Sequence, residues 1–363
     1  MRPSAAGRRR EAAGRVVATM LSGQLVAQAI SVVTRLGIPD RIARRPRSAS
    51  ELARATRTDR VALHRTLRAL ASAGVFSELK HQRFGATALS DVLRAGVPGS
   101  LRAVAILAGE PWRRAIFDLG RSVKTGRSAF ALEQRVPFYD YLARHPARFD
   151  VFTEVMAYKW QHLAAAVVRA WNPVRARTVV DVGGGSGALV AAILRASPRT
   201  TAVVLDLPGA LALAKRHLAA AGLTQRGRVM QGDFFRVIPA GGDTYLLAFV
   251  LHNWDDARAI RILRRCRAAL SDGAKLLIIE TPVPPNGRPS PAKVHDLEML
   301  VFTPGGRERT LAEYRVLLAS AGLRLQRVLS TGTPVAILET VRARHRGARR
   351  RATAAAAAPR SSR

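Results

Sequence analysis

A glycine-rich loop with one acidic residue is the first feature of this sequence that could do chemistry. Residues 181–187 read Asp-Val-Gly-Gly-Gly-Ser-Gly and overlap the end of a β-rich run, Thr178–Val182. Glycines at the end of such a strand let a ligand approach the backbone at the edge of a parallel sheet. The loop therefore predicts a site for a nucleotide-like cofactor.

Two cofactor classes compete for this loop. Gly183, Gly185 and Ala188 satisfy the loose G-x-G-x-x-G/A pattern of dinucleotide-binding proteins. Gly183, Gly185 and Gly187, with Asp181 directly upstream, also form D-x-G-x-G-x-G, which is typical of S-adenosylmethionine (SAM) enzymes. The loop alone therefore leaves both cofactors open.

Three further residues, each at or just beyond the end of a later β-rich run, add to this site. Asp206 ends the second β-rich run, where a carboxylate can accept hydrogen bonds from the ribose hydroxyls of either cofactor. Asp233 follows the third run and favours SAM, because Gly232-Asp233-Phe234 would edge the adenine. His252 lies just beyond the fourth run, at the carboxyl edge where ligands bind.

With these residues in view, the chain resembles the large O-methyltransferase family that includes plant caffeate and flavonoid methyltransferases, acetylserotonin methyltransferases and bacterial enzymes tailoring polyketides and other aromatic metabolites. The resemblance covers nearly the whole chain. Its motifs occur in the family's order: Leu36-Gly37-Ile38, Gly99-Ser100-Leu101-Arg102, the loop at 181–187, Leu205-Asp206-Leu207-Pro208, Gly232-Asp233-Phe234-Phe235, Leu251-His252-Asn253-Trp254-Asp255-Asp256 and Gly305-Gly306-Arg307-Glu308-Arg309-Thr310.

The resemblance implies a SAM-dependent O-methyltransferase of secondary metabolism that methylates a hydroxyl of an aromatic or polyketide-like small molecule. In-line transfer from a sulfonium requires a deprotonated hydroxyl about 3 Å from the methyl carbon. A phenol has a pKa near 10 and an imidazole near 6.5, so the proton moves as the oxygen attacks. By resemblance, His252 is the general base, and Glu280 and Glu308 orient it.

The resemblance also implies a homodimer and two sets of binding residues. The set expected to bind SAM is Asp181, Gly183, Gly185, Asp206, Leu207, Asp233 and Phe234. The set expected to line the acceptor pocket is Phe152, Met156, Met299 and Thr303.

The chain departs from the family pattern at two positions. The plant enzymes have Asp where this chain has Asn253, and a cofactor-contacting Lys where it has Ala248. Both departures leave cofactor affinity and pocket electrostatics open. No metal site is expected, because nothing near His295 and Asp296 completes a ligand set.

The elements that must position these residues form an alternating pattern of strands and helices, which indicates a parallel sheet covered on both faces. Leu325–Leu329 and Pro334–Leu338 add a terminal hairpin-like pair. The predicted fold class is α/β, a Rossmann-like SAM methyltransferase sheet with an N-terminal all-helical/winged-helix dimerisation domain. The five alternating runs are Thr178–Val182, Thr201–Leu205, Arg228–Gln231, Thr244–Phe249 and Lys275–Ile279.

The winged helix is read from local signals. Ser48 and Glu51 form a capping box, and Asp59 precedes a helix whose buried face is Leu63, Leu67 and Leu70. Two short strands, 75–78 and 83–86, follow.

The predicted domains are 1–15, a basic disordered N-terminus; 16–105, the winged-helix dimerisation domain; 106–170, a helical linker contributing to the acceptor pocket; 171–342, the SAM-binding Rossmann-like catalytic domain; and 343–363, a disordered basic tail.

Basic side chains on the third helix of the winged helix raise an alternative function. Arg60, His64, Arg65 and Arg68 would suit a DNA-binding regulator with a degenerate or effector-binding methyltransferase domain. However, any solvated face of so arginine-rich a chain carries such residues, and the same fold often only pairs subunits. We therefore expect no specific nucleic-acid partner.

Composition bounds the remaining possibilities. The 59 Lys+Arg and 25 Asp+Glu give a formal net charge of +34, which attracts polyanions nonspecifically at low salt. The single Cys266 excludes an intrachain disulfide and a cysteine zinc cluster, and a reduced, cytoplasmic setting fits best.

One apolar N-terminal stretch, residues 16–33, has two interpretations. Three preceding arginines and Ala27-Gln28-Ala29 imitate a secretory signal. The preferred interpretation is an amphipathic helix, because Ser22, Gly23, Gln24 and Gln28 make the stretch too polar to span a membrane. The face predicted to be apolar is Val17, Leu21, Leu25, Ala29 and Val33.

Overall fold

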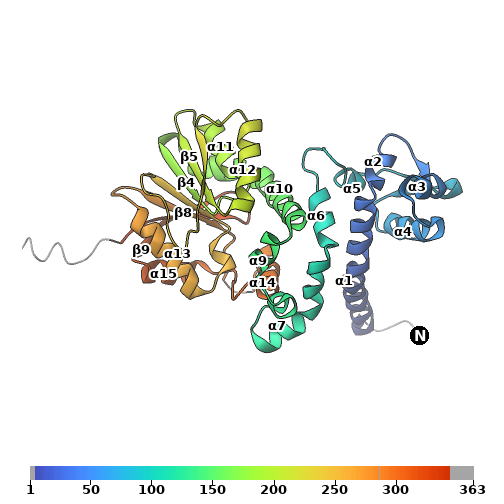
Figure 1. Cartoon of the computed structure of the whole chain (residues 1–363). Helices are drawn as coiled ribbons and strands as arrows, with labels where there is room; N and C mark the ends of the chain where they lie inside the picture. Colours follow the sequence, from blue (N-terminus) through green and yellow to red (C-terminus); the bar gives the residue numbers. More distant parts are fainter. Residues whose placement is uncertain (1–4, 286, 344–363) are drawn as a thin grey trace, which may run out of the picture. The chain divides into compact units, whose positions relative to one another are not determined.

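A computed structural model describes residues 5–285 and 287–343 (Figure 1). The chain divides into two compact units, one made of residues 1–120 and 139–162 and the other of residues 121–138 and 163–363. Apart from residue 343, the predicted C-terminal tail lies outside the described residues.

The first unit contains the predicted winged helix. Its helices are α2 (Ile38–Ile42), α3 (Ala49–Thr56) and α4 (Arg60–Ser72). A three-stranded antiparallel sheet has the order β1 (Arg47–Ser48), β3 (Arg83–Gly85), β2 (Ser77–Leu79). The capping box at Ser48 and the Asp59 cap are both present, so these local predictions are confirmed.

The buried face of α4 is the predicted one. Leu63, Leu67 and Leu70 are buried in the core of this unit. His64 differs from the expectation of a solvated basic face, because it is half-buried with its ring centroid 5.9 Å from that of Phe84.

Helix α1 (Ala5–Arg35) is longer than expected. Residues 5–15, which we predicted to be disordered, form its first part. Its apolar side chains change from exposed to buried along the helix: Leu21 is 68% and Leu25 78% exposed, whereas Val33 is fully buried. By length and composition, Ala6–Arg35 could cross a membrane, so our argument that this stretch is too polar to do so was wrong.

Residues 106–170 are largely helical, as expected. Helix α6 (Arg102–Ala108) packs against α1, and Gln28 Nε2 donates to Ala108 O at 3.0 Å. The other helices around this region are α5 (Ala88–Asp91), η2 (Pro111–Asp118), α7 (Leu119–Thr125), α8 (Ala129–Gln134), α9 (Phe138–Ala143) and α10 (Pro146–Trp171).

The second unit contains a mixed seven-stranded sheet of order β6-β5-β4-β7-β8-β10-β9. The first five strands in this order run parallel, and β10 runs antiparallel to both of its neighbours, which confirms the predicted terminal pair. The strands are β4 (Thr178–Val182), β5 (Thr201–Asp206), β6 (Gly227–Gln231), β7 (Thr244–Ala248), β8 (Lys275–Glu280), β9 (Leu323–Ser330) and β10 (Ala336–Arg342).

Helices cover both faces of this sheet. Val179 and Val180 point to opposite faces of β4, and both are buried. Helices α11 (Ala188–Ala196) and α12 (Pro208–Ala220) pack together beside β5 and β6. Helices α13 (Asp256–Ala269) and α15 (Leu311–Ser320) also pack together, and their buried residues join the core cluster of β7 and β8.

Candidate active site

The glycine loop follows β4 and begins with a buried acid. Asp181 is 1% exposed, and its Oδ1 has no hydrogen-bond partner among the described residues. Burial, reinforced by the nearby charge of Asp206, raises the pKa of Asp181 to about 7. A polar atom buried without a partner is costly, so it suits a site that gains hydrogen bonds from a ligand.

Asp206 ties this loop to β5. Its Oδ2 accepts the Gly185 N–H at 2.8 Å, and its Oδ1 accepts the Leu207 N–H at 2.7 Å. Burial raises the pKa of Asp206, although these two hydrogen bonds act in the opposite direction. Gly185 has a φ of +56°, and the space where a Cβ would lie is open, so its backbone is accessible to a ligand.

The segment after β6 lies at the same edge, because β6 pairs with β5. Asp233 Oδ1 accepts the Phe235 N–H at 2.8 Å, which shapes the turn. The Phe234 ring lies 5.0 Å from the Phe235 ring and 6.4 Å from Trp254, measured between centroids. An acid and an aromatic cluster thus border the glycine loop.

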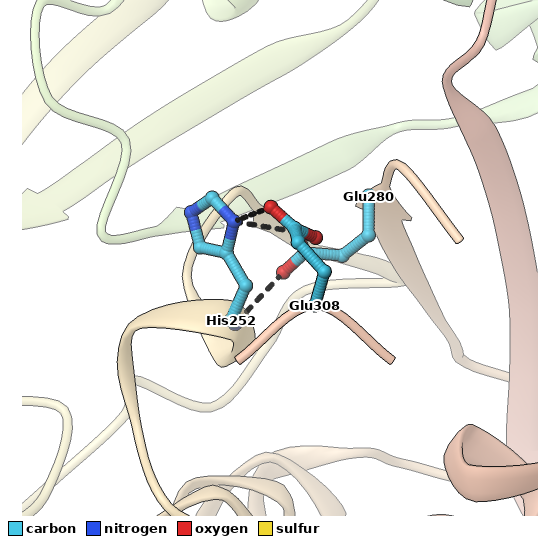
Figure 2. Close-up of side chains that lie close together, drawn as sticks. All are labelled: His252, Glu280 and Glu308. Carbon is cyan, nitrogen blue, oxygen red and sulfur yellow. Dashed lines mark hydrogen bonds and ion pairs between the residues drawn. The ribbon is translucent and has the colours of Figure 1, made fainter. Parts of the chain in front are cut away.

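His252 lies in the short helix η4 (Leu251–Asn253) after β7 and contacts two buried acids (Figure 2). Its Nδ1 lies 2.9 Å from Glu308 Oε1 and 3.6 Å from Glu280 Oε2. Glu280 is the last residue of β8, the strand next to β7. The structure therefore brings the three predicted catalytic residues together.

The backbone of this turn is also held by buried groups. Glu280 Oε1 accepts the N–H groups of Leu251 at 3.0 Å and His252 at 3.3 Å. Phe249 enters the turn with a φ of +55°, which is unfavourable for a bulky side chain. Asn253 Nδ2 donates to Phe249 O at 3.0 Å, so this side chain supports the conformation.

A glycine lets the Glu308 segment approach the turn closely. A Cβ at Gly306 would collide with His252 O and with Thr303 Oγ1. The Gly306 N–H donates to Thr303 Oγ1 at 2.9 Å, and Thr303 Oγ1 donates to Met299 O at 2.7 Å.

The predicted acceptor residues fall in two units. Phe152 and Met156 lie on α10 in the first unit, and Met299 lies on α14 (Pro291–Phe302) in the second. Thr303, directly after α14, is only 3% exposed and uses its hydroxyl locally. A shared pocket for these four residues stays a prediction.

The three residues around His252 also have the spacing of metal ligands. Candidate ligand atoms of His252, Glu280 and Glu308 all lie within 4.8 Å of one another. Hydrogen bonding already engages His252 Nδ1 and one oxygen of each acid, because Glu280 Oε1 accepts two backbone N–H groups and Glu308 Oε1 contacts His252 Nδ1. The expectation that no metal binds here therefore stays a prediction.

Sequence reasoning missed two supporting residues. Asp296, considered only as a metal ligand, accepts the Glu308 N–H at 2.7 Å, and burial raises the pKa of its carboxyl. Arg309 is fully buried beside the turn. It lies within the motif that carried the family resemblance, so the motif marked its position but not its role.

Family models match both units. Residues 18–96 match the O-methyltransferase dimerisation domain, and residues 116–324 match the O-methyltransferase domain. The chain belongs to the O-methyltransferase family. Most of the apolar helix α1 lies within the dimerisation match.

Relatives of the enzyme span nearly its whole length. It is 41% identical to phenazine O-methyltransferase PhzM of Lysobacter antibioticus, over 89% of this chain and 95% of that relative. It is 39% identical to an 8-amino-8-demethylriboflavin N,N-dimethyltransferase of Streptomyces davaonensis, over 86% of this chain and 91% of that relative. Members therefore methylate oxygen or nitrogen.

Solved structures agree with this relationship. The crystal structure of LaPhzM has a TM-score of 0.87 and 40% identity, covering 91% of this chain and 99% of that chain. The O-methyltransferase NcsB1 of neocarzinostatin biosynthesis, solved with SAM and 2-hydroxy-5-methyl naphthoic acid, has a TM-score of 0.76 and 33% identity, covering 87% of this chain and 95% of that chain. The enzyme is a SAM-dependent methyltransferase of secondary metabolism.

Proposed function

We propose that the enzyme methylates a hydroxyl of an aromatic or polyketide-like small molecule, with His252 as the general base. The observation that carries this proposal is the 2.9 Å contact between His252 Nδ1 and Glu308 Oε1. A carboxylate only accepts, so the neutral imidazole donates from Nδ1 and carries its lone pair on Nε2. Nε2 is therefore the atom that takes the acceptor's proton.

Different residues of the chain are proposed to bind the cofactor, remove the proton and hold the base in place. When bound, SAM supplies the methyl group, and we propose that Asp181, Gly183, Gly185, Asp206, Leu207, Asp233 and Phe234 hold it. His252 removes the proton as the acceptor oxygen attacks, and Glu308 stabilises the resulting imidazolium. Glu280 holds the turn through two backbone N–H groups and adds a second negative charge 3.6 Å from Nδ1.

Oxygen is favoured over nitrogen as the accepting atom because of this base. A neutral hydroxyl must lose its proton to become a good nucleophile, whereas an amine attacks with its lone pair. NcsB1, solved with a hydroxynaphthoic acid, supports an aromatic acceptor. Phe152, Met156, Met299 and Thr303 are proposed to line its pocket.

The test begins with labelled SAM and a panel of phenols and polyketides. Once an acceptor is found, His252→Ala should lower kcat by roughly 10²–10⁴-fold, the usual contribution of general acid–base catalysis. The affinity for S-adenosylhomocysteine (SAH) should stay nearly unchanged. If His252→Ala kept near-full activity at neutral pH, the enzyme would act on an already ionised acceptor and the assignment of the base would be wrong.

We further propose that the enzyme is a cytoplasmic homodimer joined through α1 and the winged helix. The dimerisation match and the exposed Leu21 and Leu25 support the dimer. A single buried thiol at Cys266 is consistent with the compartment.

We expect no sequence-specific DNA binding. Arg60, Arg65 and Arg68 are exposed on α4, so nonspecific retention at low salt is expected. Nanomolar, sequence-specific binding at moderate salt, without methyl transfer to any panel member, would instead favour a regulator.

A further inference from the structure

We propose that Arg309 is a positioning residue that fixes the turn carrying His252. The proposal rests on the proposed role of His252 as the base. Arg309 is fully buried, and its guanidinium donates to two backbone oxygens of the turn. Nη1 lies 3.0 Å from Leu251 O, and Nη2 lies 2.7 Å from Trp254 O.

These two carbonyls bracket the base. Leu251 directly precedes His252, and Trp254 follows it by two positions. A planar guanidinium presents its donors in fixed directions, so it can hold two acceptors in one geometry where an ammonium would act as a single point charge. Arg309 thus restrains both ends of the turn.

A carboxylate compensates the buried charge of Arg309. Asp256 Oδ1 accepts Arg309 Nε at 3.0 Å and Nη2 at 2.8 Å. Burial alone would raise the pKa of Asp256, but hydrogen bonds from Arg309 and Arg307 outweigh it and lower the pKa. Asp256 is therefore ionised at neutral pH and pairs the guanidinium, as a buried cation requires.

The neighbouring residue orients the imidazole itself. Glu308 contacts the His252 ring while Arg309 holds the His252 backbone, so two consecutive side chains act on one turn. The segment that carries Glu308 and Arg309 is itself anchored, because Asp296 accepts the Glu308 N–H at 2.7 Å and Arg309 O accepts the Val283 N–H at 2.9 Å. Ring and backbone are thus placed by the same anchored segment.

The backbone of this turn should relax when the restraint from Arg309 is removed. Phe249 enters it with a φ of +55°, and such conformations persist only where the surroundings over-determine them. Arg309 holds the carbonyls of Leu251 and Trp254, which lie two and five residues after Phe249. The loss of Arg309 should therefore let the turn relax and move the imidazole.

The test compares full-length Arg309→Lys with Arg307→Lys as a matched control. Arg307 is the same residue type two positions away and also pairs with Asp256, but no described hydrogen bond joins its side chain to the His252 turn. Asp256→Asn is a second variant, because Asp256 is half exposed and its change is mild. Each variant is labelled with ¹⁵N-histidine, and the His252 ring signals are assigned by their loss in His252→Ala.

We expect the Nδ1–H signal of His252 to persist in the wild type and Arg307→Lys, and to be lost to solvent exchange in Arg309→Lys. Turnover gives a second readout, using a panel phenol and its ring-fluorinated analogue that is ionised at the assay pH. A misplaced base should lower kcat roughly 10–10²-fold on the parent phenol but less than about threefold on the ionised analogue, with SAH affinity unchanged. Asp256→Asn should also weaken the Nδ1–H signal and lower kcat on the parent phenol, each by less than Arg309→Lys does.

Two outcomes would overturn the inference. One is an Arg309→Lys enzyme that keeps both the Nδ1–H signal and the parent-phenol kcat. The other is an equal loss on both acceptors, which indicates a merely structural role. Failure of the proposal that His252 is the base would give a different result. His252→Ala would then keep near-full kcat on the parent phenol, while the Nδ1–H signal would still show whether Arg309 holds the turn.

Discussion

His252 Nδ1 lies 2.9 Å from Oε1 of Glu308, a residue 56 positions later in the chain. Both side chains are almost fully buried, so solvent screens their interaction weakly. The pair fixes the tautomer of the imidazole and favours the imidazolium that forms when a proton arrives.

Replacing Glu308 by Gln should lower kcat by roughly 10-fold, because a charge-assisted hydrogen bond is about twice as strong as a neutral one. The amide oxygen still accepts from Nδ1, so the imidazole stays oriented. Steady-state kinetics on the panel acceptor measure the effect, and SAH titration is the control. A loss as large as that of His252→Ala would contradict this division of roles.

Chelation should leave activity unchanged. Among the groups with metal-ligand spacing, His252 Nδ1 and one oxygen each of Glu280 and Glu308 are engaged in hydrogen bonds, so we expect the base to act without a metal. The measurement is turnover before and after EDTA and dialysis, with elemental analysis of the protein. Activity that disappears and returns with one added divalent ion would refute the expectation.

Asp206→Ala should weaken SAH binding by roughly 10–100-fold, because hydrogen bonds to charged groups contribute about 1.5–3 kcal/mol. The same change also releases the Gly185 and Leu207 N–H groups. Calorimetric titration measures the affinity, and exposed Asp272→Ala is the control. NAD should not bind; equal NAD binding without SAM binding would reject the cofactor site.

The pKa of Asp181, raised from 3.8 to about 7, predicts a pH-dependent stability of the cofactor-free enzyme. Between these two values the unfolded chain releases a proton that the native state retains, so the free energy of unfolding falls as pH rises through this window. Asp181→Asn removes this penalty. Its gain in melting temperature should be larger at about pH 8 than at about pH 5, and equal gains at both would argue against the raised pKa.

Charges on the exposed face of α1 should separate the subunits. Leu21 and Leu25 are 68% and 78% exposed in one chain, and an obligate interface covers such surfaces. We expect the full-length double variant Leu21→Glu, Leu25→Glu to be monomeric by light scattering, with the wild type dimeric. A wild-type monomer that sediments with phospholipid vesicles would assign this face to a membrane.

Local signals made most of the fold predictable. Ser48, Glu51 and Asp59 cap their helices through bonds spanning three residues, which a sequence displays directly. The strands of the second unit are short β-rich runs between helices, and six of the seven were placed within two residues at each end; β10 ends at Arg342, four beyond prediction.

Long-range polar contacts were not predictable in the same way. Burial of a charged residue is rare, so nothing local indicates that Arg309 is enclosed; its acceptors Leu251, Trp254 and Asp256 lie more than fifty positions away. The sequence predicts a strand that ends at Phe249, because a bulky residue seldom adopts the positive φ that the structure shows there. The family motifs indicated His252 and its acids, whereas the roles of the residues that hold them emerged only from the fold.

The distance in sequence between His252 and its partners has a consequence for synthesis on the ribosome. The glycine loop, Asp206 and Asp233 are all complete before residue 234 has been added. The residues that contact the His252 ring and its turn, Glu308 and Arg309, are added only 56 and 57 residues after His252. A nascent or prematurely terminated chain that ends before residue 308 therefore contains the residues of the cofactor loop without those that orient the base. Competence to transfer a methyl group thus arises late in translation, after the parts that recognise the cofactor.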